Sequence, residues 1–183
     1  MNRRTFLSTT GTLAAAGLAG CSGDSGDNKL LGQPTKTVSS PQGVEPQHRS
    51  FGETVEFPRV SLTVSDPRMM KTYEWSENGE AKTADAGEGN QWAMAHVRAE
   101  NIADREARLP LTLDFKGVVG ERVFHPGRNK SPTAKYIGGK ADPGVVSEGD
   151  MGFLVPESAS VDQFRVLYEE RRTDGKHAVW WEP

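Results

Sequence analysis

The chain has 183 residues, a single cysteine, and a formal net charge of −3 from 25 acidic and 22 basic residues. This acidic balance argues against nucleic-acid binding, which needs a basic patch or stripe, and against electrostatic attachment to anionic lipid surfaces. With one cysteine, no disulfide can join two residues of the chain.

The first twenty residues have the layout of an export signal. Arg3 and Arg4 lead, a mildly apolar run follows, and small residues stand just before Cys21. The run is shorter than the roughly 20 apolar residues that a membrane-spanning helix needs, and its order is that of a secretory signal. The paired arginines resemble the twin-arginine export signal, and "LAGC" resembles a lipobox, in which a lipid is attached to the cysteine. The alternative is an N-terminal helix with a chance cysteine.

A modified Cys21 would explain the only thiol in the chain, because a lipid thioether requires sulfur. A two-chain lipid is a stable membrane anchor, since each buried CH₂ contributes about 0.8 kcal/mol. We therefore expect a protein exported by the twin-arginine route and held by lipid on the extracytoplasmic face of the membrane. Such a lipoprotein with an acidic body resembles the secreted proteins of salt-loving archaea.

Residues 21–50 are rich in Ser, Gly, Pro, Gln and Asp, and apolar residues are sparse. Such a composition cannot bury enough surface to offset chain entropy, so we predict a flexible linker with a reach of about 30 Å. The alternative is an irregular strap that docks on the body through Leu30, Leu31 and Val44.

Residues 51–183 have the size of one domain and show recurrent period-two alternation. Turn residues such as Asn78-Gly79 and Pro143-Gly144 separate the runs. These features predict an all-β protein, an antiparallel two-sheet sandwich of about seven to nine strands. The candidate strands are "VSLTV", "TYEW", "WAMAHVRAEN", "ARLPLTLDF", "ERVFH", "AKYI", "DMGFLVP", "QFRVLYEE" and "HAVWW", with a loop at 65–67 and a polar stretch at 76–91.

The longest candidate strand, "WAMAHVRAEN", has two different faces. Its small face carries Ala93, Ala95, Val97 and Ala99, and the other carries Trp92, Met94, His96 and Arg98. We expect the small face to lie in the core, because His96 and Arg98 prefer water. The other expected core residues are Leu111, Leu113, Phe153, Val155, Phe164 and Val166.

Three segments in order carry a family resemblance: "VSLTVSD", then "WAMAHVRAEN" with "LPLTLDFKG", then "PGVVSEGDMGFLVPESASVDQFRVLYEE". Residues 54–170 thereby resemble the telokin-like, immunoglobulin-like extracellular domain of many bacterial and archaeal lipoproteins, a domain of unknown function. The resemblance implies an immunoglobulin-like sandwich, with Gly152 and Pro156 shaping a strand and Asn101 at a strand-end turn. It implies no activity, because the shared residues are turn and core positions.

No catalytic motif occurs. The sequence has no Gly-x-Ser-x-Gly elbow, no His-Glu-x-x-His, no phosphate loop and no dinucleotide fingerprint. We therefore expect no enzyme, no cofactor and no catalytic residue, although a pocket lined by His125, Tyr136 or Tyr168 with converging carboxylates would reopen that question. The expected function is a binding module for a protein or cell-surface partner.

Metal binding is the second hypothesis. A blue-copper centre is excluded in the body, which has no cysteine. Met94 and His96 lie two apart on one strand and could form a Cu(I) site, whereas the competing interpretation makes Met94 a packing residue and His96 a surface residue. The acidic residues at 77, 80, 85 and 88 could bind calcium or simply be solvated. Trp180-Trp181 could bind a ligand, but we expect one ring in the core and the other partly exposed.

Overall fold

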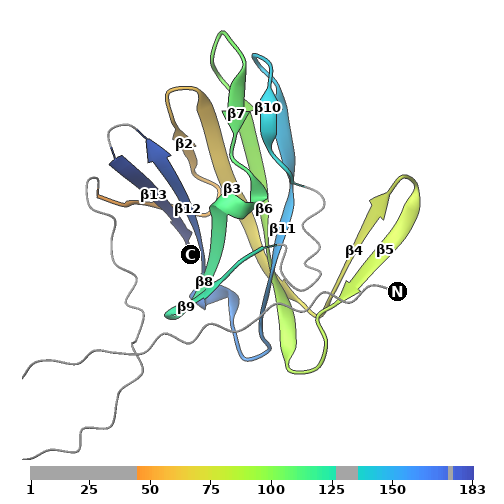
Figure 1. Ribbon diagram of the computed structural model, residues 1–183. Coiled ribbons are helices and arrows are strands. Elements are labelled where there is room, and N and C mark those ends of the chain that lie inside the picture. Colours follow the sequence, from red (N-terminus) through yellow and green to blue (C-terminus); the bar gives the residue numbers. More distant parts are fainter. Residues whose placement is uncertain (1–44, 127–135, 173–174) are drawn as a thin grey trace, which may run out of the picture. The chain divides into compact units, whose positions relative to one another are not determined.

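The computed structural model describes residues 45–126, 136–172 and 175–183 (Figure 1). The chain divides into two units, Met1–Lys36 and Thr37–Pro183, and all described residues belong to the second. The predicted signal residues Arg3, Arg4 and Cys21 and most of the predicted linker lie outside the described residues. Among the described residues, no helix has the length and apolarity needed to cross a bilayer.

One sheet of the sandwich has four antiparallel strands in the order β11-β6-β3-β2. They are β2 (Thr54–Glu56), β3 (Val60–Met70), β6 (Asn90–Asn101) and β11 (Val146–Pro156). The long strands β3, β6 and β11 coincide with the strongest period-two patterns in the sequence. The loop predicted at 65–67 is instead a bulge within β3, where the register to β6 shifts between Ser65 and Arg68.

The other sheet has five strands in the order β1-β13-β12-β8-β9. They are β1 (Gln47–Ser50), β8 (Phe115–Val119), β9 (Arg122–Phe124), β12 (Phe164–Arg172) and β13 (Gly175–Glu182). Its pairs are antiparallel except β1 and β13, which run parallel. Because β1 is a strand of this sheet, the predicted boundary at residue 50 is corrected: residues 47–50 belong to the body.

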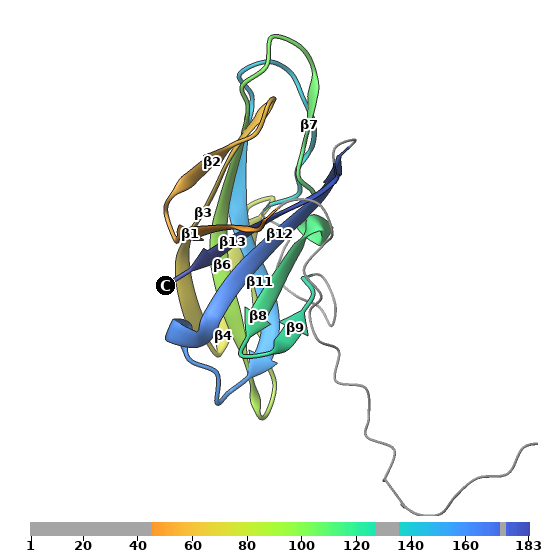
Figure 2. The same ribbon diagram turned by 90° about the vertical axis from the view of Figure 1, so that its left-hand side faces the viewer.

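Two further antiparallel pairs complete the fold, and one of them is a hairpin. β7 (Ala107–Leu109) pairs with β10 (Gly139–Ala141), and β4 (Thr72–Glu77) pairs with β5 (Glu80–Asp85). The turn between β4 and β5 is Asn78-Gly79, both with positive φ, as a two-residue hairpin turn requires. Figure 1 shows the β4–β5 hairpin on the side of the four-stranded sheet away from the five-stranded sheet, and Figure 2 shows the layers from a second direction. The predicted all-β sandwich is confirmed, with short extra strands bringing the described total to thirteen.

The core lies between the two sheets and contains the predicted small face of β6. Ala93, Ala95, Val97 and Ala99 are fully buried in one cluster with large rings from other strands. The rings are those of Phe115, Phe153, Phe164 and Trp181. Val155 and Val166 are also fully buried, so most of the predicted core is confirmed.

Leu111 and Leu113 correct the predicted core. Leu111 is only half-buried and Leu113 is 71% exposed, because a 3-10 helix, η1 (Thr112–Asp114), replaces the expected strand. Pro110 has no N–H for a strand ladder, and the Asp114 carboxylate accepts a hydrogen bond from the Leu111 N–H at 2.8 Å. The alternation of leucines across this segment therefore does not report a buried strand face. A second 3-10 turn, η2 (Val161–Gln163), precedes β12.

The second face of β6 is buried over half its length. Trp92 and Met94 pack with Tyr73 and Ala86 beneath the β4–β5 hairpin, whereas His96 is half-exposed and Arg98 is exposed. The sequence predicted that this face, with Trp92, Met94, His96 and Arg98, points away from the core. The β4–β5 hairpin buries its first half, which the sequence did not predict. Trp92 donates a hydrogen bond from Nε1 to the Ala84 carbonyl at 3.0 Å, which ties β6 to β5.

The C-terminal tryptophans behave as predicted. Trp181 is fully buried and donates from Nε1 to the Glu53 carbonyl at 2.9 Å. Trp180 is half-buried on the opposite face, between the His48 ring and the Arg165 guanidinium.

Asn101, predicted at a strand-end turn, is buried, and its side-chain amide donates hydrogen bonds to the Ala141 and Arg105 carbonyls. The predicted strand 134–137 lies partly outside the described residues, and Tyr136 and Ile137 are not in a strand.

Candidate functional site

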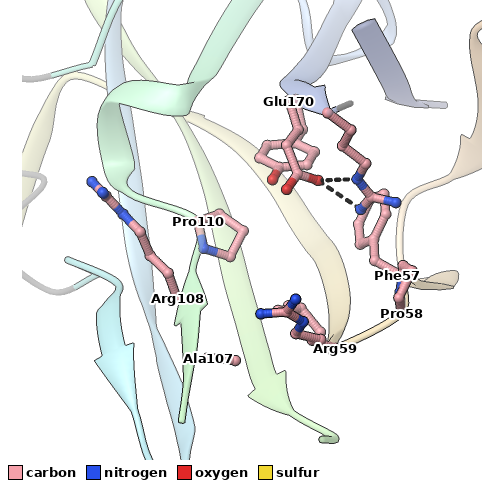
Figure 3. Close-up of a pocket in the computed structure, with 10 residues that line it drawn as sticks. Phe57, Pro58, Arg59, Ala107, Arg108, Pro110 and Glu170 are labelled. Carbon is pink, nitrogen blue, oxygen red and sulfur yellow. Dashed lines mark hydrogen bonds and ion pairs between the residues drawn. The ribbon is translucent and has the colours of Figure 1, made fainter. Parts of the chain in front are cut away.

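A hollow of about 540 Å³ opens where the β2–β3 turn, β7 and the end of β12 meet. We call it the arginine hollow, and Figure 3 shows its lining. Its volume is in the range of small-molecule sites. The lining residues are Phe57, Pro58, Arg59, Val60, Ala107, Arg108, Pro110, Tyr168, Glu170 and Arg172.

Local sequence positions each wall of this hollow. The turn between β2 and β3 is closed by a hydrogen bond from the Phe57 N–H to the Val60 carbonyl at 2.8 Å, and it presents Arg59. Tyr168, Glu170 and Arg172 alternate along β12, so all three side chains lie on one face of that strand. Pro110 follows β7 and forms the third wall.

The charged groups of the arginine hollow are partnered unequally. Glu170 accepts two hydrogen bonds from Arg172, from Nε at 2.7 Å and from Nη2 at 2.6 Å, and the guanidinium lies 4.6 Å from the centre of the Phe57 ring. Arg59 has no ion pair and no side-chain hydrogen bond with any described residue. Figure 3 shows the Arg108 guanidinium directed away from Glu170, so Arg59 supplies the free positive charge of the hollow.

Tyr168 is the buried polar residue of this hollow. Its side chain is 5% exposed and packs against the Phe57 and Phe115 rings. Burial raises the pKa of the Tyr168 hydroxyl well above its ordinary value, and the Glu170 charge adds to that effect. The hydroxyl is therefore a protonated donor near neutral pH; it has no hydrogen-bond partner among the described residues, and its oxygen is not enclosed.

A second hollow, of about 670 Å³, lies between the β4–β5 hairpin and the four-stranded sheet. We call it the hairpin cleft. Its polar centre is Asp150, whose carboxylate meets Arg68 Nη2 at 2.7 Å, the Tyr73 hydroxyl at 2.8 Å and His96 Nδ1 at 3.0 Å. Burial alone would raise the pKa of Asp150, but the hydrogen bonds from His96 and Tyr73 and the Arg68 charge outweigh it and hold the pKa below its ordinary value.

The aromatic wall of the hairpin cleft comes from β4. Tyr73 and Trp75 stack with ring centres 5.7 Å apart, and both lie on the side of the hairpin that faces the sheet. The bulge in β3 precedes Arg68, which also bonds Asp66 at 2.6 Å. A bulge re-aims the side chains that follow it, and here Arg68 joins the cluster around Asp150.

The predicted copper residues lie in and beside this cleft. Met94 and His96 share a face of β6, as their spacing predicted, but Met94 is 0% exposed beneath the hairpin and His96 bonds Asp150. Across residues 45–126, 136–172 and 175–183, no three His, Cys, Asp or Glu side chains gather to hold a metal ion. Copper binding at Met94 and His96 stays a prediction, and it requires the thioether to leave its packed position.

The acidic stretch predicted as a loop is the β4–β5 hairpin and the turn after it. Asp85 accepts hydrogen bonds from the Gly87 N–H and the Thr72 hydroxyl, and Glu80 pairs with Lys82. Asp85 and Glu80 therefore serve local contacts, and calcium binding by this stretch stays a prediction. His125 is exposed, and Tyr136 is buried with its hydroxyl donating to the Pro110 carbonyl at 2.7 Å.

Sequence reasoning missed Arg59 and its partners in the arginine hollow. The alternation of Tyr168, Glu170 and Arg172 could have placed those three on one strand face. The approach of Arg59 depends on how the two sheets stack, which no local pattern encodes.

Comparison with known proteins shows the fold alone. No family model matches the chain, and no curated protein matches it by sequence. A secreted protein from Mycobacterium tuberculosis, MPT63, is similar over 76% of this chain and 98% of its own, with 15% identity and a TM-score of 0.53. A candidate lipoprotein from Bacillus subtilis, ycdA, is similar over 73% of this chain and 39% of its own, with 9% identity and a TM-score of 0.50. A functionally unknown protein from Listeria monocytogenes matches over 73% of this chain and 82% of its own, with 8% identity and a TM-score of 0.50.

The fold and these similarities define the class of the protein as an immunoglobulin-like β-sandwich of unknown function. The arginine hollow and the hairpin cleft each combine charged side chains with apolar surface.

Proposed function

We propose that this chain is a lipid-anchored, extracytoplasmic binding module without catalytic activity, exported by the twin-arginine route. This localisation is supported by the signal-like residues Arg3 and Arg4 and by the lone Cys21. The names of two proteins with the same fold, one secreted and one a candidate lipoprotein, point to the same side of the membrane.

The observation that carries the binding function is the arginine hollow. Apolar walls from Phe57, Val60 and Pro110 surround donors that the protein itself leaves unused, Arg59 and the Tyr168 hydroxyl. A site of this kind holds a ligand by burial and directs it by a few polar groups. The one carboxylate in the lining, Glu170, is engaged by Arg172, which favours binding over general acid–base chemistry at this place.

The proposed localisation is tested by fractionating cells of the source organism that express the full chain or its variants. We expect the wild-type protein in the membrane fraction, exposed to protease added to intact cells. Cys21→Ser should release the exported protein into the soluble extracytoplasmic fraction, and the matched control Ser22→Ala should stay on the membrane.

Replacing Arg3 and Arg4 together by lysine should leave the uncleaved chain inside the cell, because the twin-arginine receptor reads the pair. Unchanged membrane retention of Cys21→Ser would refute the lipid anchor. Normal export of the double-lysine variant would refute the route.

A further inference from the structure

Arg59, Arg108 and the Tyr168 hydroxyl of the arginine hollow lack partners among the described residues, and they lie on three different elements. Arg59 comes from the β2–β3 turn and has no ion pair within the described part of the chain. The Tyr168 hydroxyl comes from β12, on a side chain that is 95% buried, and it makes no hydrogen bond there either. The Tyr168 hydroxyl oxygen is not enclosed, because Trp75 Nε1 is the only enclosed side-chain polar atom without a partner among the described residues, so this hydroxyl is open to the hollow and to a molecule that enters it.

The charge of the hollow is positive. Arg172 and Glu170 neutralise each other, and the Arg108 guanidinium points away, which leaves the single charge of Arg59. The Arg59 guanidinium can only donate hydrogen bonds, and the Tyr168 hydroxyl can donate one as well as accept. A complementary ligand must therefore bring an acceptor with one negative charge.

The walls of the hollow are apolar. Phe57, Pro58, Val60 and Pro110 line it, and the Phe57 ring is already fixed by contacts with Tyr168 and Arg172. An apolar part of a ligand would be removed from water here with little reordering of the protein.

We propose that the arginine hollow binds a carboxylate joined to an apolar body, an inference that rests on the binding function proposed above. The Arg59 guanidinium pairs with the carboxylate, the Tyr168 hydroxyl donates a hydrogen bond to the ligand, and the apolar body lies against Phe57 and Pro110. A guanidinium matches the planar carboxylate with two parallel hydrogen bonds.

A carboxylate fits this hollow better than a phosphate. A phosphate dianion would place a second negative charge near Glu170, where Arg59 alone would receive it because the unpaired Arg108 guanidinium is directed away. Two sources of the carboxylate share this chemistry: a free organic acid and the C-terminal residue of a peptide.

The test measures binding to the full-length wild-type chain in detergent by protein-observed NMR. The probes are 3-phenylpropanoate, the peptide Gly-Gly-Phe with a free C-terminus, the amide of each, and inorganic phosphate. We expect saturable binding of at least one acid and weaker binding of its amide and of phosphate. Stronger binding of the free acid indicates a small-molecule ligand, and stronger binding of the peptide indicates a protein C-terminus.

Two variants tie the binding to the hollow. Arg59→Met keeps the apolar stem and should weaken acid binding roughly tenfold or more, the value of a lost charge-assisted contact. Tyr168→Phe should weaken it by a smaller factor. The matched control Arg105→Met changes an exposed arginine outside the hollow and should bind as the wild type does. Arg59→Lys keeps the charge and should bind between wild type and Arg59→Met.

The proposal is overturned if neither acid binds saturably, if the amides bind equally well, or if Arg59→Met binds like the wild type. If the chain is membrane-anchored but binds neither acid, the ligand class is refuted and the proposed localisation is kept. If the chain binds the acids but stays inside the cell, the localisation is refuted and the ligand class is kept.

Discussion

The arginine hollow and the hairpin cleft both combine aromatic rings with charged side chains, but their polar groups are partnered differently. In the hairpin cleft, Asp150 receives hydrogen bonds from Arg68, Tyr73 and His96. In the arginine hollow, Arg59 and the Tyr168 hydroxyl have no partner among the described residues. The two places have similar volumes and similar residue types.

The Asp150 cluster is structural, although the hairpin cleft also holds one buried donor without a partner among the described residues, Trp75 Nε1. Asp150 joins β11 to β3, β4 and β6, and so it holds the β4–β5 hairpin to the sheet. A partly buried carboxylate that accepts hydrogen bonds from several donors stabilises the fold, and it is costly to disturb. Unpartnered donors stabilise nothing within the chain and are available to a ligand.

Gly138→Ala should damage the arginine hollow through its scaffold. Gly138 has φ +72°, and a Cβ there would lie 1.7 Å from the Pro110 carbonyl oxygen, so Pro110 must move. We expect a loss of about 4 kcal/mol or more in the free energy of unfolding, measured by chemical denaturation. The control Gly144→Ala has nearly the same φ, +74°, and open space around the new methyl, so it should cost only about 1–2 kcal/mol. Equal losses would show that the close approach to Pro110 is unimportant.

Asp150→Ala should destabilise the protein by about 2–4 kcal/mol, because it leaves Arg68, Tyr73 and His96 without their shared acceptor. The comparison variant Glu170→Ala removes the carboxylate of the arginine hollow. Its partner Arg172 also stacks on Phe57, and the Glu170 side chain is 38% exposed, so we expect a loss below about 1 kcal/mol. Denaturant midpoints of the two variants check the contrast, and a larger loss for Glu170→Ala would reverse the roles of the two hollows.

Acid should weaken the hairpin cleft. The pKa of Asp150 is lowered in the folded protein, so its contribution to stability is complete above its ordinary pKa and is lost as the pH falls through the folded value, below about pH 4. Glu169 has a pKa lowered in the same direction; burial opposes the shift, and hydrogen bonds from Lys116 and Lys176 outweigh it. Unfolding free energies between pH 2 and 5 should therefore fall with acid, and Asp150→Asn should flatten the curve in part. An unchanged slope in Asp150→Asn would show that its carboxylate does not bind protons differently on unfolding.

The sequence predicted the sandwich because alternation along β3, β11 and β12 reports a buried strand face directly. It failed for Leu111 and Leu113, where Pro110 and Asp114 favour a 3-10 turn over a strand. The burial of Trp92 and Met94 was not predicted either. The hairpin that buries them has a polar sequence, and it is held to the sheet by a hydrogen bond to the distant Asp150.

The candidate site was less predictable than the fold. Tyr168, Glu170 and Arg172 share a strand face that the alternation along β12 could have identified. Arg59 joins them only through the stacking of two sheets, and its lack of a partner is a property of the folded protein. No local sequence pattern predicts that the Arg59 side chain lacks a partner.

The two hollows differ most directly in their tyrosine hydroxyls, and one pair of variants measures that difference. Tyr73→Phe and Tyr168→Phe each remove one oxygen from a buried ring, and their unfolding free energies can be compared by denaturant titration at neutral pH. We predict a loss of about 1–2 kcal/mol for Tyr73→Phe, which takes a donor from Asp150, and a change within about 0.5 kcal/mol for Tyr168→Phe. Equal losses, or a larger loss for Tyr168→Phe, would show that the hydroxyl in the arginine hollow is already partnered within the protein and would contradict the account.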